Sequence, residues 1–85
     1  MPYIKQRQRD RLVGVVKAFT ENTPYDAGEL NYLVSKLVLT YVGRIGEGYQ
    51  AYNDVIGALE GAKLEVYRRQ LATYEDKKIA DNGEI

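Results

Sequence analysis

A basic and aromatic segment is the part of the sequence whose residue types come closest to binding chemistry. It consists of Lys63, Tyr67, Arg68 and Arg69. Guanidinium groups bind phosphate through paired hydrogen bonds, and a tyrosine ring stacks on a nucleobase. Glu60 and Glu65 lie at helical spacing from these cations, where they form local ion pairs that stabilise little. The segment therefore suits either a solvated charged face or an anion pocket formed where two copies meet.

Tyrosines supply a second set of candidates. The chain has eight tyrosines and no tryptophan. A tyrosine buries a flat ring but must satisfy its hydroxyl, so it suits the rim of a core, an interface or a planar ligand. Tyr49 and Tyr52 adjoin a glycine-rich connection and are candidates for a ligand lid. Tyr32, Tyr41 and Tyr67 fall near apolar stripes, where a core or interface position is favoured.

The sequence supplies little for catalysis. It contains no histidine and no cysteine, which are the commonest general base, metal ligand and thiolate nucleophile. Its one serine, Ser35, lies among apolar neighbours without a motif. Adjacent acids such as Glu75 and Asp76 point about 100° apart on a helix and do not form a calcium loop. We therefore expect no enzymatic activity, no metal site and no cofactor.

Hydrophobic periodicity predicts that these residues are positioned by helices. We expect three main helices and a short last one, at about 7–21, 27–42, 54–72 and 73–80. Pro24 separates the first two, Asp26 and Glu29 resemble a capping box, and three glycines at 43, 46 and 48 end the second helix. Gly83 ends the last. The chain is thus predicted to be a single all-α domain over 1–85, a small helical bundle.

The third predicted helix carries two apolar stripes. One holds Val55, Leu59, Ala62 and Val66, and the other holds Leu64, Tyr67, Leu71 and Tyr74. Two stripes indicate cover on two sides, by the chain itself and by a second subunit. A flank of small residues permits close approach of another backbone, either the second helix or a symmetric copy. We expect the oligomer interface to include this flank and one tyrosine: Gly57, Ala58, Gly61, Ala62 and Tyr74.

Size and charge also favour association. A chain of 85 residues buries a marginal core, and this one has no disulfide to support it. The formal net charge is zero, but residues 1–17 carry net +4 and residues 75–85 carry net −2. This asymmetry favours head-to-tail contact between subunits, or solvated faces, over a nucleic-acid arm. No apolar run approaches the roughly 20 residues of a membrane span, so we expect a cytoplasmic protein.

Several runs of residues resemble a known family. They are Met1-Pro2-Tyr3-Ile4-Lys5-Gln6, Glu29-Leu30-Asn31-Tyr32, Gly57-Ala58-Leu59-Glu60, Ala62-Lys63-Leu64-Glu65, Tyr67-Arg68-Arg69, Tyr74-Glu75-Asp76-Lys77-Lys78-Ile79 and Asn82-Gly83. Together they resemble small uncharacterised proteins found in bacteriophages and bacteria, over nearly the whole chain. The resemblance implies a phage-associated origin. Small phage proteins without catalytic residues often act by stoichiometric binding of a host protein or a nucleotide signal of host defence.

Two functions follow as expectations. The first is a non-catalytic homo-oligomer that sequesters a small anionic or nucleotide ligand. Its ligand-binding residues would be Lys63, Tyr67, Arg68 and Arg69, with Tyr49 and Tyr52. The second is an adaptor whose exposed faces bind a host or virion protein.

Overall fold

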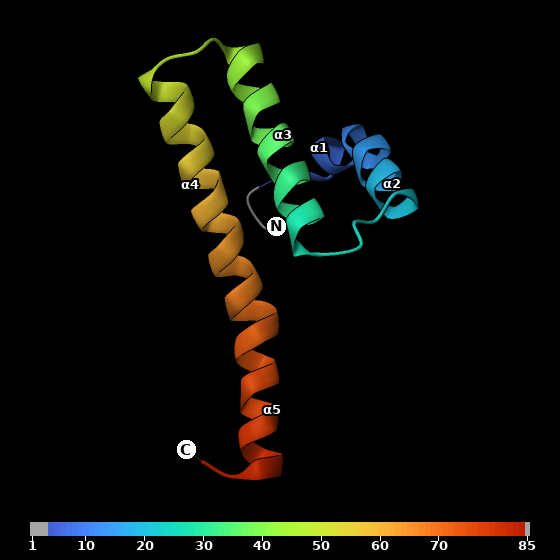
Figure 1. Cartoon of the computed structure of the whole chain (residues 1–85), viewed down its shortest axis with the longest axis vertical. Coiled ribbons are helices and arrows are strands. Elements are labelled where there is room, and N and C mark those ends of the chain that lie inside the picture. Colours follow the sequence, from blue (N-terminus) through green and yellow to red (C-terminus); the bar gives the residue numbers. More distant parts are fainter. Residues whose placement is uncertain (1–3, 85) are drawn as a thin grey trace. The chain divides into compact units, whose positions relative to one another are not determined.

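The computed structural model describes residues 4–84, and every regular element in that range is helical, which confirms the all-α prediction. The elements are α1 (Gln6–Arg11), α2 (Val13–Glu21), α3 (Ala27–Ile45), α4 (Tyr49–Val66), the π-helical turn η1 (Tyr67–Leu71) and α5 (Ala72–Asn82) (Figure 1). The contacts divide the chain into two compact units, Met1–Val34 and Ser35–Ile85. The helix α3 begins in the first unit and ends in the second.

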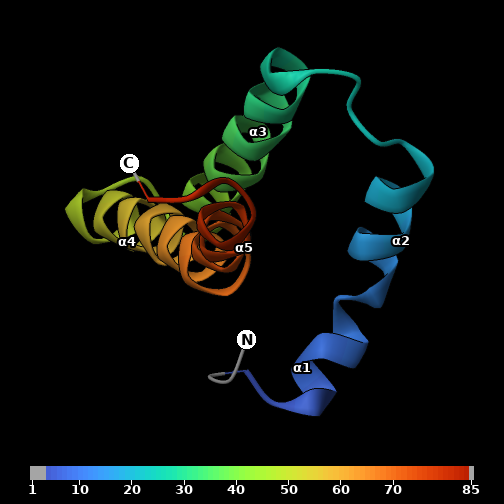
Figure 2. The same ribbon diagram turned by 90° about the horizontal axis from the view of Figure 1, so that it is seen from below.

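The first unit contains a break that the periodicity did not predict. The helix predicted over 7–21 is two helices, because Leu12 takes φ −94° and ψ 1°, outside the α region. The chain bends there between α1 and α2 (Figure 2). The amide of Leu12 still donates to the carbonyl of Gln8, and the amide of Val16 donates to the carbonyl of Leu12. Hydrogen bonding therefore continues on both sides of the bend.

The start of α3 agrees with the predicted capping box. The amide of Glu29 donates to Oδ1 of Asp26 at 2.8 Å, and Oε1 of Glu29 accepts from the amide of Tyr25 at 2.7 Å. The first bond satisfies an amide that the first turn of a helix leaves without a partner, and the second ties that turn to the residue before Asp26. The helix begins at Ala27, where the sequence placed it.

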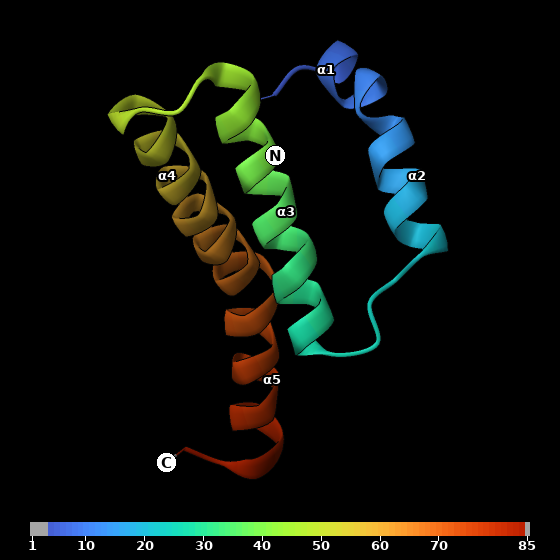
Figure 3. The same cartoon turned by 45° about the horizontal axis from the view of Figure 1, so that its top comes forward.

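The second unit is built on a helical hairpin formed by the end of α3 and the beginning of α4, which lie side by side (Figures 1 and 3). Its buried residues are Val42, Ala51 and Val55, and Val38 packs against them. The helix α3 passes through Gly43 and ends three residues beyond the predicted end, at Ile45. Gly46 ends it with φ +110°, a conformation that favours glycine, and donates its amide to the carbonyl of Val42.

Helix α4 continues through η1 into α5 without interruption (Figure 1). The predicted start of the third helix at 54 was wrong, and so was the predicted break between the helices 54–72 and 73–80. The helix starts earlier, at Tyr49, because Ala51 packs in the hairpin core. It does not stop at Thr73, whose hydroxyl donates to the carbonyl of Arg69 within the helix instead of capping a new one. Gly83 ends α5 at φ +90°, as predicted.

None of the helices in residues 4–84 combines the length and the apolar character needed to cross a membrane.

Candidate interaction surface

The basic segment is paired locally, as its spacing indicated. Nζ of Lys63 lies 3.6 Å from Oε1 of Glu60. Nε of Arg69 donates to Oε2 of Glu65 at 2.7 Å, and Nη2 of Arg68 lies 3.5 Å from Oε1 of the same carboxylate. One half-buried carboxylate therefore holds two guanidinium groups on the outside of the helix.

The ionisation of Glu65 determines the net charge of this basic segment. Partial desolvation raises the pKa of Glu65, but the charges of Arg68 and Arg69 and their hydrogen bonds outweigh that effect and hold the pKa below its usual value. The carboxylate is thus ionised at neutral pH. Three cations and two carboxylates leave a net charge of only +1 over residues 60–69 of each chain. A phosphate pocket would need this segment from two copies.

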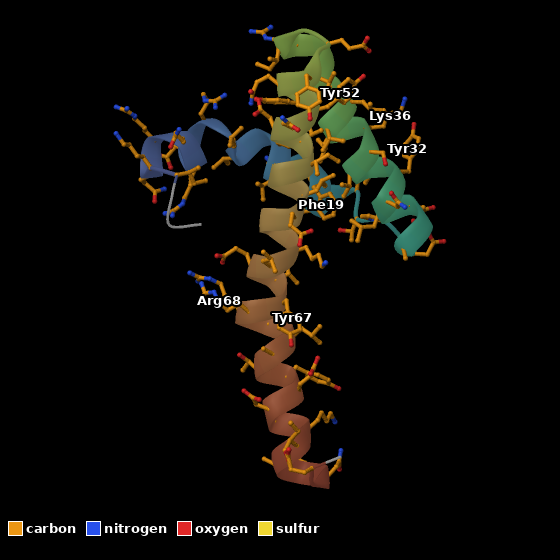
Figure 4. All side chains as sticks on the ribbon, turned by 90° about the vertical axis from the view of Figure 1, so that its left-hand side faces the viewer. Phe19, Tyr32, Lys36, Tyr52, Tyr67 and Arg68 are labelled. Carbon is orange, nitrogen blue, oxygen red and sulfur yellow. The ribbon has the colours of Figure 1, made fainter. Side chains whose placement is uncertain are left out.

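The predicted ligand-binding residues do not gather in one place on a single chain. Tyr67 and Arg68 are exposed and point to different sides of the helix (Figure 4). Tyr49 is 85% exposed, and the hydroxyl of Tyr52 donates to Oε2 of Glu47 at 2.9 Å. That bond, with the negative charge of Glu47, raises the pKa of Tyr52. Since helix rise is 1.5 Å per residue, Tyr52 and Tyr67 lie about 22 Å apart along the axis.

The flank of small residues on α4 is open. A Cβ atom added at Gly57 or Gly61 would meet no atom within 4 Å. The expected alternative of an intrachain crossing at this flank is therefore wrong. The hairpin crosses instead at Ala51 and Val55, near the start of α4. The other alternative, contact with a second copy through Gly57, Ala58, Gly61 and Ala62, stays a prediction.

An exposed apolar stripe runs along α4, η1 and the start of α5. We define the apolar stripe as Tyr52, Ile56, Leu59, Val66, Leu71 and Tyr74. All six side chains are between 37% and 65% exposed. Up to Val66 they follow α-helical spacing of three, four or seven residues, which keeps them on one face. The next step, from Val66 to Leu71, is five residues.

The π-helical turn accounts for that five-residue step. The amide of Ala72 donates to the carbonyl of Tyr67, five residues earlier, so the turn holds one residue more than an α-helical turn. In an unbroken α-helix Leu71 would lie about 140° around from Val66; with one residue absorbed, the angle is about 40°. Leu71 and Tyr74 thus join the stripe of Leu59 and Val66, not the second predicted stripe. The five-residue step is the only sequence signal of this arrangement.

Sequence comparison places the whole chain in one family. Residues 1–85 match the family described as Domain of unknown function (DUF6899). The chain belongs to the DUF6899 family. This membership confirms that the resemblance was to an uncharacterised family. Comparisons with curated proteins and with solved structures find no match. The exposed surfaces of this DUF6899 chain are therefore the features that bear on its function.

Proposed function

We propose that this chain is a non-catalytic binding protein whose working form is a homo-oligomer held together through the apolar stripe. One observation carries the proposal. The hairpin buries only Val42, Ala51 and Val55, whereas the stripe leaves six large side chains exposed along one face of the same unit. Contiguous apolar surface of this kind marks interaction sites in soluble proteins.

The size of the stripe suits self-association. Fully burying an aliphatic side chain contributes about 1.5–3 kcal/mol, so covering the four half-exposed aliphatic residues contributes about 1 kcal/mol each. A symmetric pair of chains gains about 8 kcal/mol in this way. Association costs about 4–15 kcal/mol in lost freedom. The stripe therefore supports an oligomer when further contacts add to it, such as the open flank of Gly57, Ala58, Gly61 and Ala62.

A second candidate function is sequestration of a small anionic ligand, such as a nucleotide, by the assembled protein. The observation that favours it is the position of Tyr67, Arg68 and Arg69 within the π-helical turn, since such turns are frequent at functional sites. Lys63 lies one turn earlier. Tyr49 and Tyr52 would join this site only from another copy, because they lie too far along the same helix.

The resemblance to phage and bacterial proteins supplies a setting for either function. We propose that the oligomer acts in the cytoplasm of a bacterial cell, where it captures a nucleotide signal of host defence. The alternative partner is a host or virion protein bound on the faces that the oligomer leaves exposed.

Native mass spectrometry tests the assembly. We expect the wild-type chain to be a multimer and Leu71→Glu to be monomeric with unchanged helical circular dichroism. Gln70→Glu is the matched control, because it adds the same charge to the same turn outside the stripe, and it should keep the wild-type mass. A monomeric wild-type chain at micromolar concentration would refute the proposal.

The same spectra test the second candidate. A retained nucleotide adds a few hundred daltons per site, and Arg68→Ala with Arg69→Ala should abolish that extra mass while the multimer persists. Isothermal titration with ATP, GTP and a cyclic dinucleotide provides the direct measurement. Binding that survives the double substitution would exclude this site.

A further inference from the structure

A second exposed apolar surface lies on the first unit. The bend at Leu12 places α1 and α2 around an open groove of about 580 Å³, which we call the head groove. Its lining consists of Ile4, Arg9, Leu12, Val13, Val16 and Lys17. Four of these side chains are apolar and two are cationic. Periodicity did not reveal the groove, because it depends on the bend between two helices that the sequence predicted as one.

The groove is not covered within the part of its unit that the structure describes. Leu12 is 37% exposed, Val13 is 56% exposed and Val16 is 64% exposed, and neither α1 nor α2 contains a buried residue. The surrounding segment, residues 1–17, carries net +4. An occupant of this groove must therefore present an apolar side chain at its centre and acidic side chains beside it.

Helix α5 of the same chain carries an apolar side chain with acidic side chains beside it. Ile79 is 40% exposed, and Glu75 and Asp76 lie four and three residues before it, on the same face of the helix. Residues 75–85 carry a net charge of −2, opposite in sign to the net charge of residues 1–17. The face of Ile79 lies about 80° around the helix from Leu71 and about 140° from Tyr74. Glu75 adjoins the stripe, about 40° from Leu71, whereas Ile79 and Asp76 lie outside it, so one partner can cover the stripe and this face as neighbouring surfaces.

We propose that the head groove of one copy binds α5 of a second copy. Ile79 enters the groove beside Leu12 and Val16, while Glu75 and Asp76 face Arg9 and Lys17. This inference rests on the proposed homo-oligomer and supplies the further contact that the apolar stripe needs. Each chain has one head groove and one α5. In a pair of copies each head groove can therefore bind the α5 of the other copy, which gives a closed, reciprocal dimer.

Charge reversal at each side of the contact tests this pairing. The head variant combines Arg9→Glu with Lys17→Glu, and the tail variant combines Glu75→Lys with Asp76→Lys. Each variant alone should raise the dissociation constant of the oligomer at least tenfold, measured by sedimentation at low salt. An equimolar mixture of the two should recover assembly, because each reversed surface then meets a complementary one.

Matched controls separate the contact from net charge and from folding. Arg7→Glu with Arg11→Glu changes the head by the same charge outside the groove lining. Asp81→Lys with Glu84→Lys does the same for the tail away from Ile79. Both controls should assemble as wild type, and circular dichroism should show equal helicity in all four variants.

The mixture also identifies the occupant. Assembly restored in the mixture supports binding of a second copy. Recovery only when all four substitutions are in one chain would show docking within a single chain and overturn the inference. Wild-type assembly in both reversed variants would overturn it too, while dissociation of Leu71→Glu would still leave the proposed function standing. A monomeric wild-type chain would refute both.

Discussion

The hairpin of the second unit and the helices α1 and α2 of the first differ in how far their apolar side chains are covered. In the hairpin, Val42, Ala51 and Val55 are buried, and the hydroxyl of Tyr41 donates to Oδ2 of Asp54 across the two helices at 3.1 Å. In α1 and α2 no residue is buried. The first region is held by contacts between residues distant in the sequence, and the second by local helical hydrogen bonds.

This difference indicates which region folds by itself. Helices shorter than about 12–15 residues are marginal in water unless they pack on something. Helix α1 has six residues and α2 has nine. We therefore expect the hairpin to be the stable part of an isolated chain, and α1 and α2 to be stabilised when a partner occupies the head groove.

The largest effect should come from placing a charge in the hairpin core. Val42 is 5% exposed, so Val42→Asp buries a carboxylate without a partner and should destabilise the fold by on the order of 3 kcal/mol. Val13→Asp is the matched control, since Val13 is 56% exposed. Thermal unfolding followed by circular dichroism measures both. Equal melting temperatures for the two variants would contradict the contrast between the regions.

Hydrogen exchange should show the same contrast without changing the core. In monomeric Leu71→Glu the amides of α1 and α2 should exchange at least tenfold faster than in the assembled wild type, while the hairpin amides near Val42 and Val55 stay protected. Mass spectrometry of peptides from each region provides the rates. Protection of α1 and α2 that is unaffected by dissociation would show that they need no partner.

A smaller effect is expected at the open flank of α4. Gly61→Ala meets no atom within 4 Å, so it should raise the stability of the dissociated helix by up to about 1 kcal/mol. If the flank contacts a second copy closely, the same methyl group weakens assembly severalfold. Gly43→Ala in α3 is the control, because its added methyl group is equally unhindered and lies outside the predicted interface. Unchanged assembly in Gly61→Ala would remove the flank from the interface.

The smallest effect is expected from the hydrogen bond between Tyr41 and Asp54, which joins the two helices of the hairpin. The hydrogen bond to Asp54, partial desolvation and the negative charge of Asp54 raise the pKa of Tyr41 above its ordinary value of 10.0. A raised pKa means that the bond stabilises the fold below about pH 10 and that this contribution is lost as pH rises through the higher folded value. The free energy of unfolding should therefore fall less between pH 9 and pH 12 in Tyr41→Phe than in the wild type, because the variant has no hydroxyl to ionise at this position. Absorbance titration of the tyrosines supplies the pKa.

The sequence was sufficient for features that depend on neighbouring residues. The capping box of Asp26 and Glu29, the ion pairs of Glu65 and the stop at Gly83 all follow from spacings of a few residues. The bend at Leu12 and the π-helical turn were not predicted, because hydrogen bonding continues through both and apolar residues fall on both sides. Those two features create the head groove and align the apolar stripe, so the surfaces of the candidate site do not follow from the sequence pattern.

The π-helical turn also sets the direction that the residues after it face, because it absorbs one extra residue. Removing one residue from 67–70 would restore α-helical hydrogen bonding and place Leu71 four residues after Val66, at the same angle of about 40°. Leu71 and Tyr74 would stay in the stripe. If the turn became α-helical at constant length instead, everything after it would rotate by about 100°, and Leu71, Tyr74 and Ile79 would face new directions although none of these side chains had changed. A one-residue deletion in this turn is thus mild compared with a change that converts the turn to α-helix at constant length, which alters the whole binding geometry at once.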